Sequence, residues 1–290
     1  MTLISVIIPV YNRKIELERA VKSVLDQSYD DFELIIINDC SSDKISNKFN
    51  DVRIKYLHND KNMGVSYSRN RGIKEARGKY IALLDSDDEW LPKKLEQQID
   101  FLNNNPNLRV VHTEEIWIRN GVRVNQMKKH QKSGGDIFIP SLKLCLMSPS
   151  SIMMHKSIFS DYGLFDETMQ VCEDYDLWLK ISSNEPVGFI DTPLIKKYGG
   201  HDDQLSRKYM AMDKYRVKSL LNILHAIKLT DEKKSALIDT ALSKSAILLN
   251  GALKRELADE ALYYKTIIKE LKNQSIPICL QEDGQSSPEI

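Results

Sequence analysis

The sequence predicts an α/β protein with a mostly parallel central sheet, flanking helices and a C-terminal α-helical region. Residues 3–105 alternate short apolar segments with longer segments whose apolar residues recur at helical spacing, and residues 208–273 read as successive amphipathic helices. Apolar strands that alternate with helices form parallel sheets covered on both faces. We therefore expect an α/β domain over 1–206, with halves 1–105 and 106–206, a helical region over 207–275 and a disordered tail over 276–290.

The N-terminal half contains apolar, β-branched runs that predict buried strands. These are Ser5–Val10, Phe32–Ile37, Val52–Leu57 and Tyr80–Leu84. Helices are expected between them at 13–28 and 65–77, the first because its apolar residues fall at i, i+3, i+4, i+7 and i+8. Gly78 is expected to close the second helix, and Pro92 to open a third. Ser41, Ser42 and Asp43 offer caps for a further helix.

The second half has a less regular pattern. "IWIRNGVRVN" predicts a hairpin around Asn120-Gly121, because both residues tolerate the backbone of a tight turn. Residues 126–136, "QMKKHQKSGGD", are basic and contain glycine, which predicts a mobile loop. Strands are expected at Ser150–Met154 and Val187–Ile190, and "EDYDLWLKIS" predicts a helix with acidic residues in its first turn.

The composition limits the class of partner and the compartment. Lys plus Arg and Asp plus Glu are both 41, so no net charge directs the chain to nucleic acid or to an anionic membrane. The four cysteines form no CxxC pair and fit a reducing compartment. The N-terminus reads as a strand rather than a signal peptide, and no apolar run approaches the ~18 residues that span a bilayer. We expect a cytoplasmic protein, with peripheral contact at the inner face of the membrane left open.

A carboxylate motif, "LLDSDDEW", follows the strand at Tyr80–Leu84. Asp85 and Asp87 in this D-x-D arrangement present oxygen ligands from one turn, which suits Mg²⁺ or Mn²⁺ with substrate phosphates. The alternative is a solvated acidic cap ahead of Pro92. Asp39 ends another strand, where it can accept hydrogen bonds from a base or sugar, or serve as a turn residue. Ligands of open α/β sheets bind at the carboxyl ends of the strands, where both motifs lie.

Further charged residues extend the candidate site. Arg69, in "NMGVSYSRNRGI", could pair with a diphosphate, and either it or Arg71 is an ordinary surface arginine. Glu173, Asp174 and Asp176 lie in the first turn of a predicted helix, so one could act as a base or all three could be N-terminal helix acids. His201, in "YGGHDDQLS", could be a metal ligand, although a lone histidine usually is not.

The order of these motifs is more specific than any one of them. "SVIIPVYNR", "NDCSSD", "NMGVSYSRNRGI", "GKYIALLDSDDEW", "GLFDE" and "EDYDLWLKI" together resemble the family 2 glycosyltransferases, which have the GT-A fold. The resemblance covers roughly residues 3–206. It implies a nucleotide-binding half over 1–105 and an acceptor and catalytic half over 106–206.

The resemblance also assigns roles on the donor side. The nucleoside would be held by Pro9, Tyr11 and Asp39. Arg69 matches an arginine near the diphosphate, and Asp85 matches the first D-x-D aspartate, near the ribose. The implied donor is a nucleotide-sugar, usually a UDP-sugar.

The same resemblance assigns metal binding and catalysis to three further positions. Asp87 would bind Mn²⁺ or Mg²⁺ bridging the diphosphate, and His201 matches, less securely, a histidine that closes over this metal. Asp174 matches the catalytic base of inverting members. The implied reaction transfers one sugar, with inversion, to a hydroxyl of a glycan or lipid-linked acceptor, in cell-surface polysaccharide or glycolipid biosynthesis.

Two departures from the family pattern refine this interpretation. "QLSRK", Gln204 to Lys208, has Lys208 in place of the tryptophan of the processive Q-x-x-R-W motif, so a non-processive enzyme is expected. Cys40 stands where the family usually has glycine, which leaves the turn after Asp39 open. A nucleotidyltransferase acting on a sugar phosphate, or a non-catalytic scaffold, remain as alternatives, the first disfavoured because "PVYNR" lacks a glycine-rich phosphate loop. The C-terminal helices are expected to bury their apolar faces on the core or in a homodimer.

Overall fold

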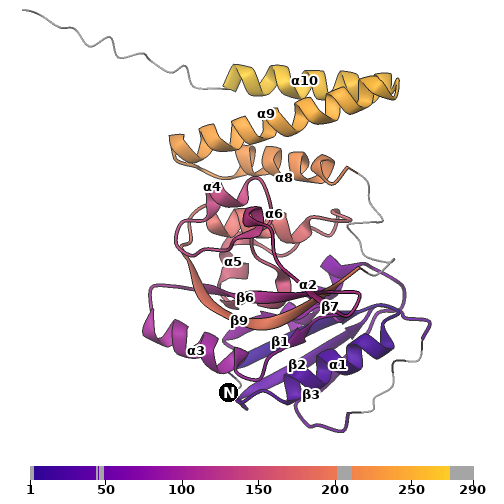
Figure 1. Cartoon of the computed structure of the whole chain (residues 1–290), viewed down its shortest axis with the longest axis vertical. Coiled ribbons are helices and arrows are strands. Elements are labelled where there is room, and N and C mark those ends of the chain that lie inside the picture. The colour runs from indigo at the N-terminus through magenta and orange to yellow at the C-terminus, as the bar shows by residue number, and fades with distance from the viewer. Residues whose placement is uncertain (1–2, 44, 46–48, 201–210, 275–290) are drawn as a thin grey trace, which may run out of the picture.

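The structure is a computed structural model, and it describes residues 3–43, 45, 49–200 and 211–274. The described residues form one nine-stranded sheet with helices on both faces and a stack of helices beyond one face (Figure 1). This confirms the predicted α/β fold with a C-terminal helical region. The strands are β1 (Ile4–Val10), β2 (Phe32–Asn38), β3 (Ile54–His58), β4 (Tyr80–Leu83), β5 (Glu89–Trp90), β6 (Val110–Arg119), β7 (Val122–Val124), β8 (Met153–His155) and β9 (Val187–Gly199).

The first four strands form the parallel part of the sheet, in the order β3-β2-β1-β4. Pro9 lies in the central strand β1, where a residue without an N–H group is normally excluded. The carbonyl of Ile7 accepts a hydrogen bond from Leu84, and β1–β4 pairing ends at Ile7 and Leu83. Residues two apart in a strand face the same neighbour, so the Pro9 nitrogen faces β4 beyond its last pair, where no ladder bond is lost.

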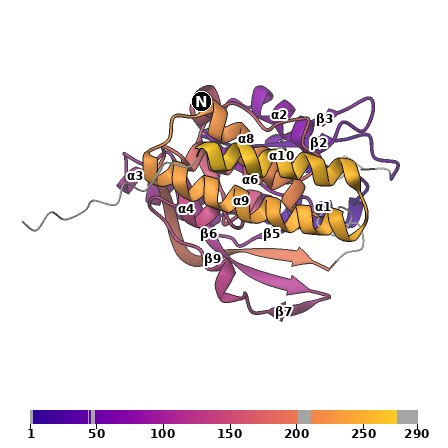
Figure 2. The same cartoon turned by 90° about the horizontal axis from the view of Figure 1, so that it is seen from above.

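The rest of the sheet is mixed. β8 joins antiparallel between β4 and β6, while β6 and β9 run parallel. The predicted β6–β7 hairpin is confirmed: Asn120 and Gly121 have φ of 50° and 76°, as its tight turn requires. Figure 2 shows this hairpin projecting from the edge of the molecule. The prediction for β9 was too short, because the strand continues to Gly199 beside β6 and pairs with β5, an element that the sequence did not indicate.

Helices cover the two faces of the sheet as the alternation of strand side chains requires. Ile8 points toward α1 (Lys14–Leu25) and α3 (Lys94–Asn104). Ile7, one residue earlier, points toward the opposite face, which packs against α2 (Val65–Glu75), α5 (Ile158–Tyr162) and α6 (Glu173–Ser182). The short helix α4 (Phe138–Ser141) lies beyond α6, toward the C-terminal helices (Figure 1).

The C-terminal helices pack on the α/β domain, which is one of the two arrangements that the sequence predicted. They are α8 (Asp213–Ala226), α9 (Asp231–Lys254) and α10 (Ala258–Gln274), stacked in successive layers beyond α6 (Figure 1). Tyr175 and Leu179 of α6 share one buried cluster with apolar residues of all three helices. Leu262 and Tyr263 remain exposed on α10, so an additional homodimer contact stays a prediction.

One described helix, α9, is long and apolar enough to cross a membrane, which the sequence analysis did not expect. This property rests on length and composition alone, and core helices of soluble proteins share it. Leu237, Ala241 and Leu248 of α9 are buried among its neighbours.

The structure bears on three local predictions. α2 ends at Glu75 without a glycine cap; Gly78 is needed instead because a Cβ there would lie 2.5 Å from the backbone nitrogen of Ser5. Asp43 accepts a hydrogen bond from the N–H of Lys14 (2.9 Å) and so caps the start of α1, while most of the segment after it, where a further helix was expected, lies outside the described residues. The basic segment 126–136, predicted as a mobile loop, is held at two points: Lys132 is buried, and Gly135 exchanges two backbone hydrogen bonds with Val187.

Candidate active site

The D-x-D segment forms the connection between β4 and β5, at the carboxyl end of the parallel strands. Asp85 accepts a hydrogen bond from Arg69 (Oδ1–Nη2, 2.7 Å), and Asp87 forms an ion pair with Arg13. Burial raises the pKa of Asp87, and the Asp85 carboxylate raises it further against the opposing effect of Arg13. Asp88 is 2% exposed and accepts hydrogen bonds from Ser150 (2.6 Å) and from the backbone of Tyr198 (3.0 Å). The acidic cap alternative therefore does not describe this segment, because its carboxylates turn inward.

Arg69 joins the two halves of the site. Its guanidinium, 3% exposed on α2, donates to Asp85 and also to Glu173 on α6 (Nη1–Oε1, 2.7 Å). Burial and the neighbouring Asp174 raise the pKa of Glu173, while Arg69 lowers it. The sequence analysis predicted that Arg69 lies near a diphosphate. In the structure its guanidinium lies between two carboxylates, those of Asp85 and Glu173.

Asp174 lies in the first turn of α6 and is half-buried, between the buried Glu173 and Tyr175. One oxygen accepts a hydrogen bond from the N–H of Tyr175 (2.7 Å), and the other lies 3.7 Å from the Cys145 thiol. The preceding Cys172 has φ of 62°, a left-handed backbone that is uncommon for a residue with a side chain. Asp176 faces elsewhere: it is buried and bound by Ser219 (2.8 Å), which makes it a structural residue.

Asp39 follows β2 and is 3% exposed. Its Oδ1 accepts hydrogen bonds from the Asn59 amide (2.7 Å) and the N–H of Met63 (2.8 Å), and its Oδ2 accepts one from the N–H of Gly64 (2.8 Å). The carboxylate thus holds the turn that leads into α2. A base would engage Asp39 through remaining lone pairs or by replacing one of these donors.

The other predicted residues are distributed around this cluster. Pro9 is buried in β1, and Tyr11, which follows the end of this strand, is 47% exposed. Arg71 donates hydrogen bonds to the His58 carbonyl and to the Asn59 side chain, as a structural arginine would. His201 lies outside the described residues, as do the "QLSRK" segment and residues 276–290.

Lys197, on β9, belongs to the cluster and was missed by the sequence analysis. Its ammonium lies 4.0 Å from the buried Glu115, and the carboxylates of Glu115, Asp88, Asp85 and Asp174 together raise its pKa against the effect of burial. Glu115 itself is held by Lys132 at 2.8 Å, and these partners lower its pKa to about 2 although burial acts in the opposite direction. No sequence pattern marks Lys197, because it lies in a strand that the apolar residues predicted to end earlier.

The charge balance of the cluster suits a divalent cation. It brings five carboxylates (Asp85, Asp87, Asp88, Glu173 and Asp174) against three basic side chains (Arg13, Arg69 and Lys197), an excess of two negative charges when all are ionised. Carboxylate oxygens are the ligands that Mg²⁺ and Mn²⁺ prefer. In the described ranges, no three His, Cys, Asp or Glu side chains converge closely enough to hold a metal alone.

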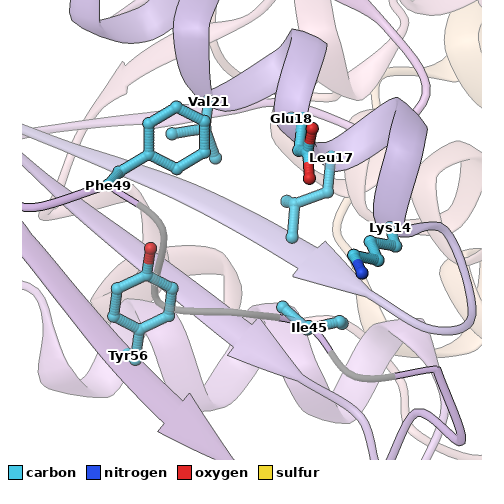
Figure 3. Close-up of a pocket in the computed structure, with 7 residues that line it drawn as sticks. All are labelled: Lys14, Leu17, Glu18, Val21, Ile45, Phe49 and Tyr56. Carbon is cyan, nitrogen blue, oxygen red and sulfur yellow. The ribbon is translucent and has the colours of Figure 1, made fainter.

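Two hollows lie outside the carboxylate cluster. A small depression beside α1 and β3 is lined by Lys14, Leu17, Glu18, Val21, Ile45, Phe49 and Tyr56 (Figure 3). A larger recess of about 360 Å³ lies against the β6–β7 hairpin and includes Glu115, Trp117 and Gln126. Because Glu115 faces both the recess and Lys197, this second hollow adjoins the candidate site.

Comparison with known proteins identifies the family. The model of the glycosyl transferase family 2 matches residues 5–163, more than half of the 290 residues. The chain belongs to glycosyl transferase family 2. An Escherichia coli relative, the UDP-Glc:alpha-D-GlcNAc-diphosphoundecaprenol beta-1,3-glucosyltransferase WfgD, is 31% identical over 218 residues, which cover 74% of this chain and 81% of the relative. The predicted membership is confirmed, and it decides against the nucleotidyltransferase alternative.

A second relative is much longer than this chain. An uncharacterized glycosyltransferase of Rickettsia bellii is 39% identical over 197 residues, which cover 67% of this chain and 28% of the relative. The chain thus spans about a third or less of the length of such relatives.

Two solved structures agree with the fold. Staphylococcus aureus TarS 1–349, solved with UDP-GlcNAc, superposes with a TM-score of 0.63 at 18% identity, covering 95% of this chain and 93% of TarS. The mannosyltransferase PcManGT of Pyrobaculum calidifontis, solved with GDP-Man and Mn²⁺, gives 0.60 at 15% identity, covering 93% and 84%. The predicted GT-A fold is confirmed.

Proposed function

We propose that this chain transfers one sugar from a nucleotide-sugar, a UDP-sugar, to a hydroxyl of a glycan or lipid-linked acceptor, with inversion and without processivity. The observation that carries the proposal is the Arg69 bridge, which connects Asp85 on the donor side with Glu173, the neighbour of Asp174. The donor named for WfgD is UDP-Glc and its acceptor a diphosphoundecaprenol lipid, which supports both substrate classes. We place the reaction in cell-surface polysaccharide or glycolipid synthesis on the cytoplasmic side of the membrane.

The residues of the site have separate tasks in this reaction. Asp174 accepts the proton of the acceptor hydroxyl as that oxygen attacks the anomeric carbon. The bond between this carbon and the diphosphate breaks on the opposite face, and the nucleoside diphosphate leaves with the electron pair. Pro9, Tyr11 and Asp39 are expected to border the nucleoside, and Asp85 the ribose. The recess beside Glu115 is our candidate for the acceptor.

A divalent cation, Mn²⁺ or Mg²⁺, would be held by Asp87, with His201 as a further candidate ligand. When bound, it supplies positive charge to the departing diphosphate. The presence of Mn²⁺ beside GDP-Man in PcManGT supports this assignment, as does the excess of negative charge in the cluster.

The test is nucleoside diphosphate release from a panel of UDP-, GDP- and dTDP-sugars, with Mn²⁺ and with EDTA. We expect slow hydrolysis of one donor, abolished by EDTA and by Asp87→Ala. Asp174→Asn is isosteric and should keep donor affinity while transfer to the acceptor falls by about 100-fold or more, the usual contribution of a positioned base. A chain that binds none of the nucleotides would contradict the proposal, and unchanged transfer by Asp174→Asn would remove that residue from its role.

A further inference from the structure

We propose that the ammonium of Lys197 binds a phosphate oxygen of the donor diphosphate and stabilises the leaving nucleoside diphosphate. This inference rests on the proposed function and adds to it a contact that the family motifs in the sequence did not indicate. It assigns direct phosphate binding to Lys197, and it gives Arg69 the task of holding the carboxylates.

The geometry of β9 directs Lys197 toward the site. Successive strand residues point to opposite faces. Lys196 and Tyr198 both contact Glu89, through Nζ and the hydroxyl at 2.8 Å each, so they share one face. Lys197 therefore projects from the other face, where Glu115 lies. The backbone N–H of Tyr198 binds Asp88 (3.0 Å), which fixes this part of β9 beside the D-x-D segment.

Lys197 also has unused hydrogen-bonding capacity. Its ammonium carries three N–H donors. Among the described residues none accepts a hydrogen bond from it, and its closest ion-pair contact is Glu115 at 4.0 Å. Glu115 is already bound by Lys132 (2.8 Å), Ser148 (2.6 Å) and Trp117 (2.8 Å). The side chain of Lys197 is 36% exposed, so an incoming ligand can reach it.

The other cations of the cluster are engaged. Arg13 pairs with Asp87, and both terminal nitrogens of Arg69 are bound to carboxylates on a guanidinium that is 3% exposed. A phosphate could reach Arg69 only by displacing Asp85 or Glu173. Lys197 can take a phosphate oxygen without breaking a hydrogen bond, and a compact ammonium is a common phosphate ligand in proteins.

The charge of Lys197 indicates that its ligand is an anion. The neighbouring Glu115 and the further carboxylates of the cluster favour the charged form of the Lys197 ammonium, and a diphosphate beside the D-x-D segment needs such a charge. The diphosphate is the part of the donor that gains negative charge as the sugar departs. A cation at this position therefore stabilises the transition state more than the bound donor.

The experiment is calorimetric binding of UDP and of uridine, and of GDP and guanosine, to Lys197→Met, Lys197→Arg and the native protein. We expect Lys197→Met to weaken nucleoside diphosphate binding by about 10- to 100-fold, as for the loss of a hydrogen bond between charged groups, and to leave nucleoside binding unchanged. Lys197→Arg should recover part of the loss. Titrations run with Mn²⁺ and with EDTA separate this contact from that of the metal.

The adjacent Lys196→Met is the matched control, because it removes the same charge from the opposite face of β9 and should change binding by less than about twofold. The ratio of diphosphate to nucleoside affinity is taken on one sample of each variant, so partial unfolding does not alter it. An unchanged ratio in Lys197→Met, with native binding intact, would overturn this inference and leave the proposed function standing. A native protein that binds no nucleotide would overturn both.

Discussion

Cys40 shows how one residue can depart from a family pattern without changing a turn. It follows Asp39 where family 2 members usually have glycine, and its φ is 60°. Glycine adopts this left-handed backbone freely, whereas other residues pay roughly 1–2 kcal/mol. The turn that the sequence analysis left open is therefore the turn a glycine would make, formed by cysteine with strain.

Substitution at this position should reveal that strain. We expect Cys40→Gly to raise the free energy of unfolding by about 0.5–1 kcal/mol and the β-branched Cys40→Val to lower it by a similar amount or more. Urea denaturation of the three proteins measures both changes. A Cys40→Gly variant less stable than the native protein would mean that the contact between the thiol and the Asp60 carbonyl (3.5 Å) outweighs the backbone strain.

His112 makes the folded state sensitive to acid. It is fully buried on β6, with Nε2 beside the Ser133 carbonyl (2.9 Å), and burial together with Lys132 lowers its pKa from 6.5 to about 3. Between these two values the unfolded chain binds a proton that the folded chain does not. The stability contributed by the neutral ring is complete above pH 6.5 and is lost as the pH falls toward 3.

His112→Gln should reduce this acid sensitivity. We expect the free energy of unfolding between pH 6 and 4 to fall less steeply in the variant, by up to about 1.4 kcal/mol per pH unit. Denaturation curves at several pH values give the slopes. His225→Gln, which changes an exposed histidine on α8, is the control and should retain the native slope. Equal slopes for native protein and His112→Gln would contradict the prediction, because they would show that the ring takes up its proton alike in the folded and unfolded states.

At the scale of elements, α6 couples the site to the C-terminal helices. One face carries Leu177 and Trp178 against the sheet side of the molecule, and the other carries Tyr175 and Leu179 against α8. Asp174 lies at the start of this enclosed helix. Its position therefore depends on packing from both sides, and α8 to α10 support the site although they contribute no cluster residue.

Leu220→Ala tests this support, because Leu220 of α8 is fully buried in the cluster that includes Tyr175. We expect unfolding to become easier by about 2–5 kcal/mol, the usual cost of a buried leucine cavity. Transfer should fall more than donor binding, because the displaced helix carries Asp174 and not the D-x-D segment. Leu262→Ala, at a position 66% exposed on α10, is the control, and it should change neither the stability nor the transfer activity by a measurable amount. Thermal unfolding and transfer assays on both variants decide the matter.

At the scale of the whole molecule, the candidate site is assembled from both halves of the α/β domain. The parallel strands place Asp39 and Asp85, while α6 and β9 contribute Asp174 and Lys197. The hydrogen bond between Arg69 and Glu173 joins two residues that are 104 positions apart in the sequence. A ligand that contacts both halves should therefore stabilise the entire domain rather than one segment.

Ligand-induced stabilisation tests this assembly. A nucleoside diphosphate with Mn²⁺ should raise the melting temperature, with a gain of about 2.7 kcal/mol in unfolding free energy at 100 times the Kd. EDTA should remove the metal-dependent part of the shift, and Asp87→Ala should remove it even with Mn²⁺ present. Differential scanning calorimetry follows both. A shift that is identical with Mn²⁺, with EDTA and in Asp87→Ala would contradict the assignment of Asp87 as a metal ligand.

Local patterns in the sequence were enough to predict the strands β1 to β4, the long helices, the family and the carboxylates at the strand ends. Those features follow from local periodicity and from motifs that lie within short segments. The sequence analysis missed strand β5 and the second part of β9, because these segments are strands through their pairing and not through their composition. β5 consists of two residues that pair with β9, and β9 continues beyond its apolar start because it pairs with β6.

The way in which the charged groups meet depends on tertiary packing and could not be predicted from local patterns. This packing placed Arg69 between Asp85 and Glu173, used both oxygens of Asp39 to hold a turn, and brought Lys197 to the carboxylates. Each of these contacts joins groups on different elements, and a sequence records the residue types but not which of them the sheet order brings together. The physical reason is that the desolvation of a charge is offset by partners in space, and those partners are chosen by the packing of the strands and helices.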